Sequence, residues 1–134
     1  MKSMLHRVML ALLLLLLSVI LPAEARWVRI AIERTGLYVL TESQLRAWGF
    51  ADPKRVGVYG TGGAMLPEDL SLLRERHLSQ TPIYIAGDKR YFFAQGTTRW
   101  VYLPEKDFFS HETNPYTRTA YYLLSDEAEP KVMQ

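Results

Sequence analysis

Apolar and polar residues alternate in several short stretches of this chain, and this spacing predicts strands. Val28, Ile30 and Ile32 fall on one face of residues 27–32, which is the two-residue period of a strand. Residues 37–40 are expected to return as the second strand of a hairpin. Further strands are expected at residues 56–59, 81–86, 91–94, 100–103 and 121–124, with 100–103 pairing back on 91–94. Short strands separated by glycine and proline turns predict an all-β fold.

One short helix is expected after the second strand. Thr41 and Gln44 have the spacing of a capping box, in which each side chain satisfies a backbone N–H at the helix start. Leu45 and Trp48 supply an apolar stripe, and Gly49 suits the end of the helix. Residues 67–77 fit either a second helix or an ordered loop. The fold class is therefore an antiparallel β-sandwich, complete or partial, with one or two short helices.

The first 25 residues have the three parts of a secretory signal peptide. Basic residues Lys2 and Arg7 precede an apolar run over residues 8–21, and an Ala-Glu-Ala cleavage site ends at Ala25. The apolar run would span about 21 Å as a helix, short of the roughly 30 Å hydrocarbon core. We therefore expect export to the periplasm, outer membrane or cell surface, with no transmembrane helix in the mature chain. Residues 26–124 then form one β-rich domain, and residues 125–134 form a polar linker or a truncated end.

Composition excludes several classes of function. The chain has no cysteine, which excludes disulfides, cysteine metal sites and a thiol nucleophile. The net charge after removal of the leader is about +1, so no electrostatic argument favours nucleic acid. All 16 tryptophan, tyrosine and phenylalanine residues lie in the mature part, which is too aromatic for a disordered chain.

The glycine-rich and histidine-containing stretches do not form recognisable sites. Gly60, Gly62 and Gly63 follow a strand, but Met65 stands where a dinucleotide-binding loop needs its last glycine. These glycines are better explained as a tight turn. His77 and His111 are the only histidines after cleavage, and no spacing supplies further metal ligands. No nucleophile and base pair is readable either, so we expect no enzyme activity, no metal and no cofactor in this chain.

The aromatic residues carry the clearest functional signal. Ten of them fall within residues 91–122. Most should form the core, but alternation along strands sends some outward, where a protein interface or a sugar platform would use them. The candidate interface residues are Trp100, Tyr102, His111, Asn114 and Tyr116.

Several segments, taken in order, resemble the N-terminal region of the type IX secretion system sortases, a gingipain-like cysteine peptidase family of Bacteroidota. The matching pieces are GLYVLT at 36–41, VGVYGTGG at 56–63, TPIYI at 81–85, FFAQG at 92–96 with Trp100, then Phe109, His111, Asn114, Tyr116, Thr117 and YYL at 121–123. Together they cover residues 27–125. The segment before Tyr91 is shorter than the family pattern, and residues 68–79 are unusually basic and leucine-rich.

The resemblance implies a non-catalytic β-domain that packs on or positions a downstream cysteine peptidase domain. The family cleaves C-terminal sorting signals from cargo at the outer membrane and joins the cargo to an anionic lipopolysaccharide. The peptidase domain of the same protein, or other secretion components, would be the partner. A fragment, a truncated gene and a stand-alone relative all fit. The alternative function is a stand-alone exported β-sandwich that binds a carbohydrate or a protein; a small secreted hydrolase ranks last.

Overall fold

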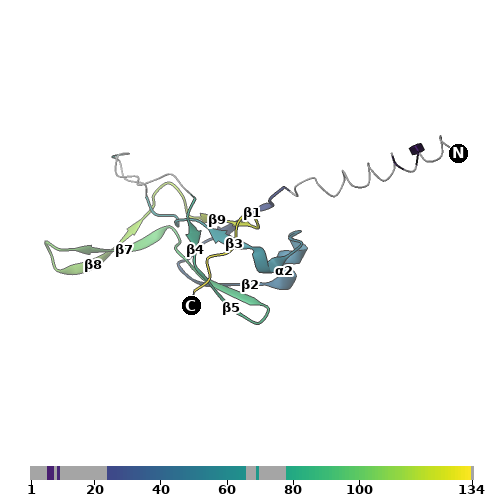
Figure 1. The fold of residues 1–134 in the computed structure, drawn as a ribbon. Helices are drawn as coiled ribbons and strands as arrows, with labels where there is room; N and C mark the ends of the chain where they lie inside the picture. Colours follow the sequence, from purple (N-terminus) through teal and green to yellow (C-terminus); the bar gives the residue numbers. More distant parts are fainter. Residues whose placement is uncertain (1–5, 8, 10–23, 66–68, 70–77, 134) are drawn as a thin grey trace.

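A computed structural model describes residues 6, 7, 9, 24–65, 69 and 78–133 (Figure 1). The named elements within these residues are β1 (Trp27–Ile32), β2 (Gly36–Thr41), α2 (Glu42–Ala47), η1 (Pro53–Arg55), β3 (Gly57–Tyr59), β4 (Gln80–Thr81), β5 (Ile83–Ala86), β6 (Lys89–Ala94), β7 (Thr98–Leu103), β8 (Phe108–Thr113) and β9 (Ala120–Ser125). Most of the apolar run of the leader lies outside the described residues, as do residues 66–68 and 70–77, so the signal peptide and the form of segment 67–77 stay predictions. The division into leader, domain and tail also stays a prediction.

Two antiparallel sheets share one hydrophobic core. The first has the strand order β1-β9-β3-β4 and the second the order β2-β6-β5. Phe92 from the second sheet meets Tyr122 from the first, with ring centroids 6.1 Å apart. The hydroxyl of Tyr122 also accepts a hydrogen bond of 2.9 Å from the backbone N–H of Gln95, just after β6. The core is completed by Ile32, Leu40, Leu45, Phe50, Val56, Val58, Ile83, Ala94, Ala120 and Leu124. The all-β sandwich prediction is confirmed.

Strand β1 has the predicted faces but a different neighbour. Val28, Ile30 and Ile32 turn toward the core, as the alternation predicts. The predicted hairpin between β1 and β2 is wrong, because β1 pairs with β9 and β2 pairs with β6. Residues 33–35 carry the chain from one sheet to the other. Strands β1 and β2 both contribute to the core between the two sheets, and this burial outweighs the short sequence separation that favours a hairpin.

The short helix forms as its capping residues predict. The Gln44 backbone N–H donates to Thr41 Oγ1 at 3.2 Å, and the Thr41 backbone N–H donates to Gln44 Oε1 at 2.9 Å. Leu45 is fully buried against the core, so tertiary packing supports a helix of six residues. Gly49 has a φ of 92°, which favours glycine at the end of the helix.

A proline divides the predicted strand at 81–86 between the two sheets. Thr81 pairs with Val58 in the first sheet, whereas Ile83 pairs with Phe92 in the second. Pro82 lies between them and has no N–H to offer a ladder. The chain therefore changes sheets at Pro82, and one predicted strand becomes two.

Strand β7 pairs with β8, so the expected pairing of residues 100–103 with 91–94 is wrong. Strand β8 was not predicted. Its sequence FFSHET is mostly polar after the two phenylalanines, and this pattern is weak for a strand that is buried on neither face. Gly60 and Gly62 have φ values of 152° and 91°, which favour glycine, and the chain bends at Gly63; the tight turn itself stays a prediction.

Candidate docking surface

Strands β7 and β8 form a two-stranded hairpin that projects from the body of the domain; we call it the arm (Figure 1). Its strands pair only with each other, from Thr98 opposite Thr113 to Leu103 opposite Phe108. At the tip, Tyr102 Oη donates a 2.5 Å hydrogen bond to Asp107 Oδ1, and Asp107 has a positive φ of 49°. This bond raises the pKa of Tyr102 above its ordinary value, with a smaller contribution from desolvation.

One face of the arm is aromatic and faces solvent. Trp100 packs against His111 across the strands with 3.6 Å between ring centroids and the rings tilted by 43°, and Tyr102 lies opposite Phe109 at 5.1 Å. Trp100 is 66% exposed and Phe109 is 63% exposed. Isolated two-stranded hairpins are marginal in water, and a third layer normally covers such a face. The face is therefore an exposed aromatic surface that no other strand of the described residues covers.

The opposite face of the arm is held by an ion pair. Arg99 Nε donates to Glu112 Oε2 at 2.6 Å. Val101 and Leu103 lie beyond this pair, half-buried beside a shallow groove of about 340 Å³. Cross-strand pairs of this kind keep the arm in register without a covering sheet.

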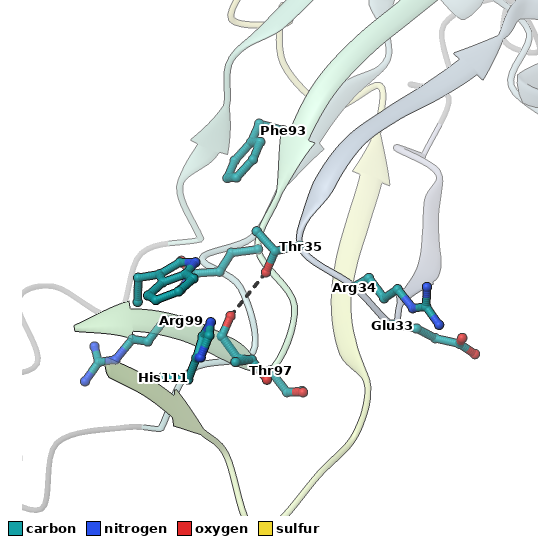
Figure 2. Close-up of a pocket in the computed structure, with 10 residues that line it drawn as sticks. Glu33, Arg34, Thr35, Phe93, Thr97, Arg99 and His111 are labelled. Carbon is teal, nitrogen blue, oxygen red and sulfur yellow. Dashed lines mark hydrogen bonds between the residues drawn. The ribbon is translucent and has the colours of Figure 1, made fainter. Parts of the chain in front are cut away.

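The base of the arm is fixed to the body. The backbone N–H of Gly96 donates to Thr35 Oγ1 at 2.9 Å. The Thr35 hydroxyl donates to the Thr98 carbonyl at 3.2 Å (Figure 2). A Cβ on Gly96 would lie 3.0 Å from the backbone nitrogen of Thr35, so a larger residue would require this backbone to shift by a few tenths of an ångström. Residues 33–35, which join the two sheets, therefore also hold the base of the arm.

Asn114 anchors the returning strand. Its Nδ2 donates to the Gly63 carbonyl at 3.0 Å, and its backbone N–H donates to the Thr97 carbonyl at 2.9 Å. Its Oδ1 accepts from the backbone N–H of Tyr116 at 2.9 Å. The side-chain oxygen and nitrogen of Asn114 thus both form hydrogen bonds within the domain. One of them ties the base of the arm to Gly63 in the glycine-rich stretch.

An open groove of about 680 Å³ lies where the aromatic face meets the body (Figure 2). Trp100 and His111 line it from the arm, and Phe93 lines it from β6. Phe93 lies opposite Leu37 in the second sheet, where the two side chains are 59% and 67% exposed. The groove therefore joins the aromatic face of the arm to an apolar patch on the outer face of the β2-β6-β5 sheet.

The described residues offer no cluster of three metal-ligating side chains. Within this part of the chain, no helix is long and apolar enough to cross a membrane. His77 lies outside the described residues.

Comparison with known proteins decides the relationship. No protein-family model and no curated protein matches the chain. Among solved structures, the crystal structure of dimeric latent PorU from Porphyromonas gingivalis matches with 44% sequence identity and a TM-score of 0.78 over 84% of this chain. The chain is similar to a part of PorU. The resemblance inferred from its sequence is confirmed at this level.

The match is limited in extent on the side of PorU. It covers 10% of the PorU chain, so most of PorU has no counterpart here. The activity, substrates and partners of the whole PorU protein are therefore matters for proposal.

The structure brings together some of the predicted interface residues and separates others. Trp100, Tyr102 and His111 share the aromatic face of the arm. Asn114 lies at its base and is engaged in support, whereas Tyr116 is 89% exposed on the loop before β9 and lines neither groove. Phe109 and Phe93 join the surface without having been named as candidates. The period-two spacing of Phe109 and His111 was the available signal, but it depends on recognising β8.

Proposed function

We propose that this chain is a non-catalytic β-domain of a type IX secretion sortase related to PorU, and that it packs through the arm on a cysteine peptidase domain of the larger protein. The observation that carries the proposal is the aromatic face of the arm, which no other strand of the described domain covers. The larger protein is inferred from the similarity to PorU, which extends over a tenth of the PorU chain. This similarity does not favour the alternative of a stand-alone carbohydrate-binding domain.

The arm suits docking because its shape is fixed before binding. Its base is bonded to Thr35 and Asn114, and its tip is bonded between Tyr102 and Asp107. A surface that is already ordered loses little conformational entropy when it binds. Tryptophan and tyrosine are the residue types that most often dominate binding energy in protein interfaces. Trp100 and Tyr102 therefore have both the residue type and the rigid placement of interface anchors.

The role follows from the resemblance and from what this chain lacks. The sequence has no cysteine, so the nucleophile of the family must come from another segment. In this proposal the β-domain positions the peptidase domain that processes secreted cargo at the outer membrane. The leader would bring the protein across the inner membrane, consistent with a cell-envelope location.

A chimera tests this function directly. Residues 27–125 of this chain replace the matching segment of P. gingivalis PorU, and removal of the C-terminal signal from secreted cargo is measured in cells that depend on the chimera. We expect processing to be retained, and to fall roughly tenfold or more when both Trp100→Ala and Phe109→Ala are introduced, as for removal of interface hot spots.

The matched control is Tyr121→Ala. Tyr121 is also about half exposed, at 51%, but it lies on β9 away from the arm. Its replacement should leave processing unchanged at equal levels of chimera. Full processing with the doubly substituted arm would overturn the proposal. If the chimera is not produced, the isolated chain gives a second test: the two arm substitutions should lower its self-association in light scattering more than Tyr121→Ala does. An equal effect of both would also contradict the proposal.

A further inference from the structure

The segment that follows β9 is held against the first sheet by one glutamine. Gln80 in β4 donates from Nε2 to the Glu129 carbonyl at 3.0 Å and accepts at Oε1 from the Lys131 N–H at 2.6 Å. Its Nε2 also donates to Tyr59 Oη at 2.9 Å, which fixes the amide in place. We call residues 129–133 the strap. Gln80 therefore clamps the strap to the edge of the β1-β9-β3-β4 sheet.

The strap then reaches the edge of the second sheet. The Ile83 N–H donates to the Lys131 carbonyl at 2.8 Å, and the Met133 N–H donates to the Ile83 carbonyl at 2.8 Å. These two bonds make a parallel bridge between Ile83 and Val132. They form the first rung of a parallel ladder on β5.

The geometry of β5 places a second rung beside the first. Strands β5 and β6 are joined by the two-residue turn 87–88, and Ala86 lies opposite Lys89 at its end. That closing pair is hydrogen-bonded in a two-residue hairpin, and such pairs alternate with pairs whose backbone groups point outward. Ile83 and Ile85 therefore direct their N–H and C=O groups away from β6. Those of Ile83 are used by the strap, whereas those of Ile85 have no partner among the described residues.

Within the described part of the chain, residues 84–86 of this edge carry no feature that guards it against another strand. Natural proteins block exposed edges with charges, proline or bulges. Tyr84, Ile85 and Ala86 are uncharged, and Tyr84 and Ile85 are 53% and 36% exposed. The edge is therefore open along the line on which the strap already runs.

We propose that β5 is the docking edge for the polypeptide that continues from the strap in a longer protein containing this chain. The continuing segment adds a parallel strand to the β2-β6-β5 sheet. The Ile85 N–H donates to the Met133 carbonyl, and the Ile85 carbonyl accepts from the N–H of the second residue after Met133. The strap supports this occupant, because it fixes both the direction and the register of the new strand.

This inference rests on the proposed function and extends it to the junction between domains. A flexible linker would let the next domain sample many orientations, whereas a strand paired with β5 fixes the direction in which the chain leaves. The strap is clamped at Gln80 in one sheet and at Ile83 in the other. The exit direction is thereby tied to the body that also holds the arm.

Amide hydrogen exchange, followed by NMR, tests the proposal. The full chain is extended after its last residue by Thr-Val-Thr-Val-Thr and compared with the unextended chain. We expect the extension to slow exchange of the Ile85 amide roughly tenfold, the effect of one added hydrogen bond. A matched extension that begins with proline removes the N–H that the Ile85 carbonyl needs, and should return the Ile85 rate toward that of the unextended chain.

Two substitutions separate the strap from general loss of structure. Gln80→Leu should speed exchange at Ile83 and Met133 and abolish the effect of the extension at Ile85. Arg55→Ala removes only an exposed ion pair with Glu129 and should leave the Ile85 effect intact. The proposal would be overturned if the fused extension left the exchange rate of the Ile85 amide unchanged. It would also be overturned if this amide were protected only when the same five-residue peptide is added as a separate molecule. No peptidase domain is present in this experiment, so its failure is distinct from failure of arm docking.

Discussion

Glu42 is expected to matter more for stability than the arginine with which it pairs. Arg90 is 1% exposed, and its Nη2 lies 3.4 Å from Glu42 Oε1. Its Nε and Nη1 have no hydrogen-bond partner among the described residues. Glu42→Gln keeps the shape of the side chain but leaves the buried guanidinium without a counter-charge. Arg90→Met removes the charge and its unsatisfied N–H groups while retaining an apolar side chain of similar length.

The size of the two effects follows from burial. Removal of one partner from a buried ion pair costs about 3–5 kcal/mol, whereas apolar replacement of the buried charge is often neutral or stabilising. Water reaches Glu42, whose side chain is 25% exposed, so we expect a cost at or just below the lower end of that range. We expect Glu42→Gln to reduce the free energy of unfolding by about 2–3 kcal/mol, a fall in Tm on the order of 10 °C for a domain of this size. Arg90→Met should stay within about 1 kcal/mol of the parent chain or exceed its stability.

Urea unfolding followed by tryptophan fluorescence measures both variants, and the double variant completes the cycle. In the Arg90→Met background, Glu42→Gln should lose most of its effect, because no buried charge remains to be compensated. The reasoning is refuted if Arg90→Met destabilises the chain by several kcal/mol while Glu42→Gln is neutral. That result would mean that the arginine stabilises the core through contacts other than this ion pair.

Three further results are expected. Gly96→Ala should destabilise the chain by roughly 1–3 kcal/mol in urea unfolding, because its Cβ meets the backbone of residues 34–35 at 3.0–3.2 Å; wild-type stability would contradict the tight passage at the arm base. Trp100→Ala should change the unfolding free energy of the isolated chain by no more than about 0.5 kcal/mol, since Trp100 is mostly exposed; a large loss would mean that the arm is part of the folding core. Asp107→Asn should lower the pKa of Tyr102 in an NMR titration, because the hydrogen bond to the Asp107 carboxylate raises it. Because the pKa is raised, the bond stabilises the folded chain at pH values below the ordinary pKa of tyrosine. This stabilisation is lost as the pH rises through the pKa of Tyr102 in the folded chain. An unchanged titration would show that the bond is not formed.

Local features of the fold could be predicted because they depend on neighbouring residues. The faces of β1 follow from alternation, and the start of α2 follows from two side chains three residues apart. The positive φ values of Gly60 and Gly62 likewise follow from the backbone preference of a single residue type.

Strand pairing could not be predicted from the same signals. Residues 33–35 look like a hairpin turn by length, yet they join two sheets, because the choice depends on which faces meet in the core. Strand β8 was missed for a related reason. A strand that is largely exposed on both faces lacks the apolar alternation that marks a half-buried strand.

The candidate site shows the same limit. Exposed aromatic residues indicated an interface, and Trp100, Tyr102 and His111 do gather on one face. The sequence could not separate Asn114, which supports the arm, from residues that face outward, since that difference is a matter of hydrogen bonds to Gly63 and Thr97.

Photo-cross-linking from the arm tests the central proposal most directly. A photoreactive phenylalanine analogue is placed at Phe109 in the PorU chimera, and a matched chimera carries it at Tyr121 on β9. Mass spectrometry of the irradiated proteins should find cross-links from position 109 to the cysteine peptidase domain, and none to that domain from position 121. Cross-links from position 109 that reach only its own domain, or equal cross-linking from both positions, would contradict packing of the arm on the peptidase.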